Sequence, residues 1–149
     1  MNDPLIAFGS LLGVGVLVLL NWLLGGWADA RLGDREAVIA RWQEDFWEDS
    51  VVDVLLDRDG RCALIDSGPS AKGLIVARGD GFVTRRLVPG TLRALARPEP
   101  GRLVLKLMDL SLPQVVLEAE PDEIGAFLAT NFPEAHAANA TSGSGLSPA

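Results

Sequence analysis

The longest apolar run of this chain lies at its start. Residues 4–28, 25 in number, carry no charged side chain. As a helix they would be about 37 Å long, enough to cross a hydrocarbon core about 30 Å thick. Trp22 and Trp27 stand near the end of the run, where aromatic side chains favour the membrane interface. The pattern therefore predicts a single transmembrane helix over residues 4–28.

A cleaved signal peptide is the alternative, because Ala28, Asp29 and Ala30 fit a small-x-small cleavage site. A signal peptide has a basic start and an apolar stretch of roughly 7–15 residues. Here residues 1–3 include an acid and no base, and the apolar stretch is longer. We therefore expect the helix to be retained as an anchor.

The basic residues around this helix are unevenly placed. No Lys or Arg precedes it, whereas Arg31, Arg35 and Arg41 follow it closely. The positive-inside rule then puts the N-terminus outside and the rest of the chain in the cytoplasm. The expected location is the inner (plasma) membrane of a bacterial cell, crossed once.

Two glycines in the predicted membrane helix are four residues apart. Gly9 and Gly13 would lie on one face, and small residues at this spacing let two helices approach closely. A glycine-rich segment also produces this spacing by chance. Helix packing through Gly9 and Gly13, and with it a homodimer, stays open beside the incidental interpretation.

Residues 31–50 show helical spacing, with Val38, Trp42 and Phe46 recurring at every fourth position and Asp34 placed as an N-cap. The segment holds six acids and three bases, the reverse of the balance found in helices that lie on anionic membranes. We therefore expect this amphipathic juxtamembrane helix to pack its aromatic face against the domain that follows.

Short apolar runs, several of them alternating with polar residues, follow one another from residue 51 to residue 120. Such runs between turn residues are typical of an antiparallel sandwich or barrel. Residues 121–132 return to helical character, and residues 133–149 form an Ala/Ser/Gly-rich tail that we expect to be disordered. The expected strands are residues 51–57, 61–66, 73–78, 81–88, 91–97, 102–109 and 114–120.

The predicted fold over residues 51–132 is a small α+β domain, a seven-stranded antiparallel barrel or sandwich capped by a C-terminal helix. This plan resembles that of pleckstrin-homology-like (PH-like) domains. The resemblance rests on strand number and order and includes no motif, so it carries no function.

Two hairpins can be paired residue by residue. Asp59-Gly60 predicts a type I′ turn for the first hairpin. It sets Asp53 opposite Asp66 on one face, and Val54 opposite Ile65 and Leu56 opposite Ala63 on the other. A four-residue loop, 98–101, predicts the second hairpin. It pairs Ala96 with Leu103, Ala94 with Leu105 and Leu92 with Leu107 on the core face, and Arg97 with Arg102, Leu95 with Val104 and Arg93 with Lys106 on the outer face.

The outer face of the second hairpin would then carry a basic strip, defined as Arg93, Arg97, Arg102 and Lys106. Residues 72–106 hold eight of the 13 basic residues and two of the 20 acids. The strip is a candidate contact for anionic lipid, an anionic ligand or a protein partner. The alternative is neutralisation within the protein. A next hairpin that places Glu120 opposite Arg102 and Glu118 opposite Val104 would do this, as would the acids of residues 31–50.

Candidate chemistry is sparse in this sequence. His136 is the only histidine and lies in the predicted tail, while the only cysteine, Cys62, lies on a predicted strand. No motif for nucleotide, metal or nucleophilic catalysis occurs, so we expect neither an enzyme nor a cofactor or metal site. A net charge of −7 argues against nucleic acid as a partner.

These observations favour a non-enzymatic, membrane-tethered interaction module, an accessory subunit or scaffold that binds a protein partner in a membrane complex. The alternative is a sensor of anionic lipid or an anionic ligand that uses the basic strip.

Overall fold

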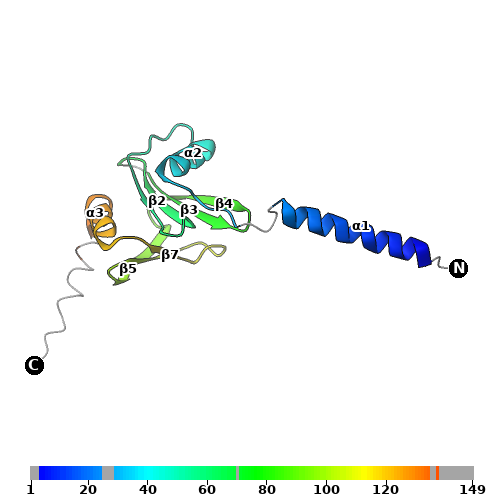
Figure 1. Ribbon diagram of the computed structural model, residues 1–149. Coiled ribbons are helices and arrows are strands. Elements are labelled where there is room, and N and C mark those ends of the chain that lie inside the picture. The colour runs from blue at the N-terminus through cyan, green and yellow to red at the C-terminus, as the bar shows by residue number, and fades with distance from the viewer. Residues whose placement is uncertain (1–3, 25–28, 70, 135–136, 138–149) are drawn as a thin grey trace, which may run out of the picture.

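The computed structural model describes residues 4–24, 29–69, 71–134 and 137. A helix, α1 (Pro4–Leu23), precedes an α+β domain from which it projects (Figure 1). The 18-residue stretch Ile6–Leu23 is 0% buried, long and apolar enough for a membrane anchor or a signal sequence. Trp27, Ala28, His136 and most of the expected tail lie outside the described residues.

The domain contains seven antiparallel strands in two sheets, as the sequence predicts. The first sheet has the order β1 (Asp53–Leu56), β2 (Cys62–Asp66), β3 (Lys72–Arg78) and β4 (Gly81–Leu87). The second has the order β5 (Leu92–Glu99), β6 (Arg102–Leu107) and β7 (Gln114–Glu118), and α3 (Pro121–Asn131) follows it.

The two sheets do not close into a barrel. Of the two predicted arrangements, barrel or sandwich, the barrel is therefore wrong. Residues 88–91 join β4 to β5, and these two strands form no ladder. At the other edge Arg58 N–H donates to Glu118 O at 2.6 Å. The Asp57 carboxylate also accepts from Glu118 N–H at 2.8 Å. These bonds join the turn after β1 to the end of β7 without merging the sheets.

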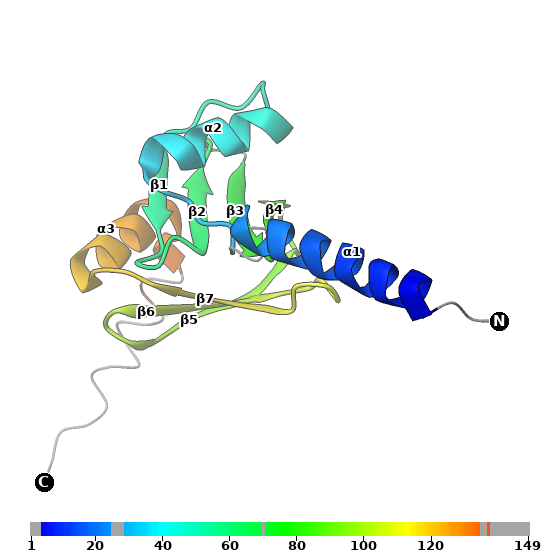
Figure 2. The ribbon, with the colours of Figure 1, turned by 45° about the vertical axis from the view of Figure 1, so that its right-hand side comes forward.

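A second helix, α2 (Arg35–Asp45), covers one face of the first sheet (Figure 2). Asp34 accepts a hydrogen bond from Ala37 N–H at 2.8 Å, so the predicted N-cap is confirmed. The expected packing of the helix is confirmed too, because Val38 and Trp42 are 0% exposed in a cluster with Ile65 and Ile75.

The opposite face of the first sheet meets the second sheet and α3. Leu64 and Leu74 are buried there against Leu103, Leu105 and Leu117 of the second sheet and Ile124 and Leu128 of α3. The first sheet is thus covered on both faces, which explains why every residue of β2 is buried.

The first hairpin has the predicted register, with Asp53 opposite Asp66 and Val54 opposite Ile65. The type I′ turn is wrong, because only Gly60 of the pair Asp59-Gly60 has a positive φ, +67°. Gly60 N–H closes the turn onto Asp57 O at 2.9 Å. The Asp57 carboxylate also accepts from Asp59 N–H and Arg61 N–H at 3.3 Å, which holds the loop without a second positive φ.

The second hairpin departs from the predicted register. Leu92 lies opposite Leu107 as expected, but irregularities follow at Leu92/Ala94 and at Ala96/Glu99. They shift the pairing, so that Lys106 faces Ala94 and Arg102 faces Glu99. The like-charge pairs Arg93–Lys106 and Arg97–Arg102 are therefore wrong. Leu105 faces Leu95 and Val104 faces Ala96, in place of the expected Ala94–Leu105, Leu95–Val104 and Ala96–Leu103.

The register between β6 and β7 is two residues away from the expected one. Arg102 lies opposite Glu118, where Glu120 was expected, and Val104 lies opposite Val116. A shift of two residues keeps every side chain on its expected face, since the side-chain period of a strand is two.

Candidate functional site

The basic strip is divided between the two ends of the second sheet. Arg97 belongs to the end near α3, where its guanidinium donates to Pro100 O at 2.7 and 2.9 Å and to Pro121 O at 2.7 Å. These bonds tie the turn between β5 and β6 to the first residue of α3. Arg97 is therefore engaged in holding the fold together.

Arg102 lies at the same end and has an acid across from it on each neighbouring strand. Glu99 of β5 and Glu118 of β7 are its cross-strand neighbours. Opposite charges at such positions stabilise a sheet. The structure thus places an acid opposite Arg102, as the neutralisation alternative requires, with Glu118 in place of Glu120.

Arg93 and Lys106 lie toward the other end of the second sheet. Lys106 faces Ala94 and Gln114, neither of which is charged, and Arg93 is exposed in the irregularity between Leu92 and Ala94. Within the described part of the chain, no acid is directly across from Lys106. Of the four strip residues, these two keep a net positive charge at their end of the sheet.

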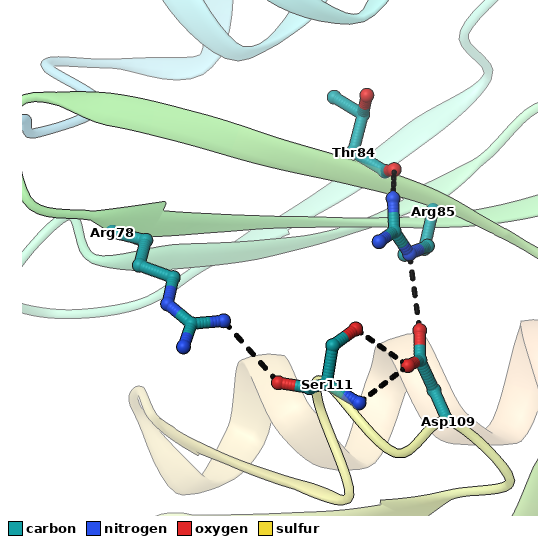
Figure 3. Close-up of polar contacts among 5 residues, drawn as sticks. All are labelled: Arg78, Thr84, Arg85, Asp109 and Ser111. Atoms are coloured by element: carbon teal, nitrogen blue, oxygen red, sulfur yellow. Dashed lines mark hydrogen bonds and ion pairs between the residues drawn. The ribbon is translucent and has the colours of Figure 1, made fainter.

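Beside them, the loop of residues 108–113 joins β6 to β7. Figure 3 shows how it is fixed to the first sheet: Arg85 Nε donates to Asp109 Oδ2 at 3.1 Å, and Arg78 Nη1 donates to Ser111 O at 3.3 Å. Asp109 Oδ1 accepts from the amide and the hydroxyl of Ser111 at 2.8 and 2.6 Å. These bonds from Ser111, and then the bond from Arg85, lower the pKa of Asp109 to about 2.

The same loop exposes two large apolar side chains. Met108 is 67% exposed and Leu110 reaches 104%, the highest value among the large apolar residues of the described chain. Leu112 is half-buried and packs against the core. Sequence reasoning missed this feature: the pattern predicts Met108 within a strand over residues 102–109, and it gives Leu110 no role. The one available signal is a leucine between Asp109 and Ser111, in a segment with the polar residues of a turn.

The segment after α1 is docked on the hairpin turns of the first sheet. Ala30 N–H donates to Gly79 O at 2.8 Å and Leu32 N–H to Gly60 O at 2.7 Å, while Arg61 pairs with Asp29 at 3.1 Å. A Cβ on Gly60 would come within 3.0 Å of Leu32 O, so this approach requires glycine. The end of the domain with the turns at Gly60 and Gly79 is therefore the end nearest α1.

The expected acidic face of the first hairpin is present, since Asp53 and Asp66 lie directly across from each other. Each has a basic partner: Asp53 pairs with Arg35 at 3.2 Å, and Asp66 with Lys72 at 2.5 Å. Lys72 also donates to Asn131 of α3 at 3.1 Å. Both members of this facing pair of acids are therefore compensated by a basic side chain.

Two of the six acids of residues 31–50, Asp45 and Asp49, hold the α2 segment on β4. Asp49 pairs with Arg86 at 2.7 Å, and the Arg86 guanidinium lies 4.5 Å from the ring centre of Phe46. Asp45 accepts from the Thr84 hydroxyl, and this bond, with Arg41, lowers the pKa of Asp45 against the opposing effect of burial. These two acids contact β4 and not the basic strip.

A groove of about 400 Å³ runs along the free edge of β1 between α2 and α3. Asp57 N–H donates to Cys62 O at 2.9 Å, and antiparallel pairing alternates, so the backbone groups of Val54 and Leu56 point away from β2. The groove is lined by Arg35, Asp53, Val54, Leu55, Leu56, Glu123, Ala126 and Phe127.

No described group of three or more His, Cys, Asp or Glu side chains could hold a metal ion. Cys62 is buried, and burial, with the nearby Asp57 charge, raises the pKa of its thiol well above the ordinary range. A thiol in this state is a poor nucleophile.

Nothing lies within 4 Å of a Cβ placed on Gly9 or Gly13, so a second helix has room to approach there. A hollow on α1 lies nearer Gly15, bounded by Phe8 and Leu19.

Comparison of this chain with protein-family models, with curated proteins and with solved structures gave no match in any of the three.

Proposed function

We propose that this chain is a non-enzymatic, membrane-tethered interaction module, an accessory subunit or scaffold of a membrane protein complex. α1 spans the inner membrane once with the N-terminus outside, and the α+β domain stands at the cytoplasmic surface. One contrast carries the proposal. The apolar stretch Ile6–Leu23 of α1 is 0% buried, whereas the two hydrophobic clusters of the domain contain no residue of α1. So large an exposed apolar surface needs lipid or protein around it.

The groove along β1 is the surface that we favour for the partner. An exposed strand edge offers backbone groups to an extended segment, which binds by adding a strand. On β1 these are the groups of Leu56 and the carbonyl of Val54, because Val54 N–H already donates to the Asp53 carboxylate at 2.8 Å. Glu123 gives the groove a negative charge beside the Arg35–Asp53 pair. The strand order and the C-terminal helix are compatible with a PH-like topology. A shared topology does not identify a ligand.

Affinity purification of the full chain in mild detergent tests this proposal. We expect a protein partner in stoichiometric amount, lost in the Glu123→Arg variant and kept in Glu48→Arg, an exposed acid outside the groove. Extraction with alkaline carbonate should leave the full-length chain in the membrane. A chain shortened by the loss of α1, or a wild type without any partner, would contradict the proposal.

Sensing of anionic lipid remains a second candidate, favoured by the net charge that Arg93 and Lys106 keep at their end of the sheet. Flotation of residues 29–134 with vesicles would then require anionic lipid. The double variant Arg93→Glu/Lys106→Glu should abolish it. Flotation that ignores lipid charge would remove this candidate.

A further inference from the structure

We propose that the loop of residues 108–113 inserts Met108 and Leu110 into the headgroup region of the membrane that holds α1. The loop is then a second lipid contact, which sets how the domain stands on the bilayer. This inference rests on the proposed function, because it takes α1 to be in the membrane.

The position of the loop follows from a short chain of contacts. Ala30, the second residue of the described segment after α1, donates a backbone hydrogen bond to Gly79 O. Arg78, which precedes Gly79, donates from its side chain to Ser111 O of the loop. Figures 1 and 2 both show the connection into β7 at the end of the domain that faces α1. Five residues separate Leu23 from Asp29, a span of about 20 Å at most. The domain therefore stays close to the bilayer surface.

The loop is built to present its apolar side chains. Asp109 and Ser111 are bonded to each other on either side of Leu110, and Arg85 and Arg78 fix both to the first sheet. Single exposed leucines are ordinary on protein surfaces. Here two large apolar side chains are exposed on one loop whose backbone is held by hydrogen bonds, so that their insertion would cost little conformational entropy.

The charges at this end suit the cytoplasmic leaflet, whose anionic lipids attract basic residues near the surface. Arg93 and Lys106 flank the loop from the second sheet, and Arg78 borders it from the first. The acids at this end of the domain include Asp29, Asp59, Asp80 and Asp109, of which Asp29 pairs with Arg61 and Asp109 with Arg85. A lipid surface is the occupant that this combination of apolar tip and basic surround fits best.

An environment-sensitive fluorophore at position 110 tests the inference in the full chain. Leu110→Cys is labelled with nitrobenzoxadiazole, and native Cys62 stays unlabelled because it is buried as a neutral thiol. The control is Val52→Cys, an apolar residue that is 60% exposed. Val52 precedes β1 and lies about 17 Å along the strand from the Asp57 turn. Both are reconstituted in phosphatidylcholine vesicles with and without phosphatidylglycerol.

We expect blue-shifted emission and quenching by brominated lipid at position 110, and water-like emission at position 52. Arg93→Glu/Lys106→Glu should reduce the shift in vesicles that contain phosphatidylglycerol. Flotation of the same samples reports whether α1 holds the chain. Floating vesicles with water-like emission at position 110 would overturn the loop contact alone, and a chain that does not float would overturn the tether as well. The labelled chain is also measured in native membranes. A shift found there and absent from both kinds of vesicle would assign the loop to a protein partner and overturn the lipid contact.

Discussion

The indole ring of Trp42 lies directly over the backbone of Gly73. A Cβ on Gly73 would come within 3.0 Å of three atoms of that ring, closer than real side chains approach. Trp42 is 0% exposed, and its position couples α2 to the centre of the first sheet, where Gly73 pairs with Ile65 and Arg86. The absence of a side chain at residue 73 is what allows the helix to lie so close.

Gly73→Ala should therefore destabilise the domain, because the ring has to move and α2 with it. We expect a loss of about 1–3 kcal/mol in the free energy of unfolding, the usual cost of overpacking a core. Urea denaturation of the full chain in detergent, followed by circular dichroism, measures it. Gly81→Ala is the matched control, since nothing lies within 4 Å of a Cβ there. Equal effects of the two variants would contradict the prediction.

The ion pair between Lys72 and Asp66 should be worth more than those on the surface. Its side chains are 22% and 9% exposed, and Lys72 also bonds to Asn131, so the pair joins two strands to α3. Lys72→Ala leaves a buried carboxylate without its partner and should cost about 3 kcal/mol. Arg58→Ala, which breaks the exposed pair with Glu120, should cost less than about 1 kcal/mol. Similar losses for both would show that burial adds nothing to the inner pair.

The loop of residues 108–113 should lose its order only in strong acid. The pKa of Asp109 is lowered from 3.8 to about 2, so the folded state favours the ionised carboxylate. Its contribution is complete above about pH 4 and is lost as the pH falls toward about 2. Amide hydrogen exchange at Ser111 measures the effect. Asp109→Asn should raise that exchange already at neutral pH, whereas Asp80→Asn, an exposed acid in a turn, should not.

The first hairpin could be predicted to the residue because both its faces constrain it. Asp57 to Arg61 form a strong turn signal, and a one-residue slip would have moved Val54 and Leu56 to the face of the aspartates. Even there the predicted turn type was wrong. Asp59 does not adopt the positive φ that a type I′ turn requires, and the Asp57 carboxylate holds the loop by accepting from Asp59 N–H and Arg61 N–H. Side-chain bonds of this kind leave no trace in hydropathy.

The second sheet was harder to predict. Pro98 has no N–H to pair, and each of two irregularities adds one residue to β5. The first inserts Arg93, and the second sets Arg97 and Pro98 against the single residue Leu103, which a strict period of two does not reveal. The error moved the candidate site itself: a strip of four like charges became an engaged Arg97, a compensated Arg102 and two basic residues beside an apolar loop. The strand pattern extends over Met108 and Asp109, the first two residues of the loop, and so hides where the loop begins.

Arg97 and Arg93 should differ sharply in their effect on stability, although the sequence placed both on one basic face. The Arg97 guanidinium donates to Pro100 O and Pro121 O, and its removal leaves the start of α3 without this tie. Arg97→Ala should cost about 1.5–3 kcal/mol, the range for hydrogen bonds made by a charged group. Arg93→Ala should stay within about 0.5 kcal/mol, as is usual for exposed residues. Urea denaturation of both variants measures this. An equal loss in both would mean that Arg93 also holds the fold, and would remove it from the charges available to a membrane.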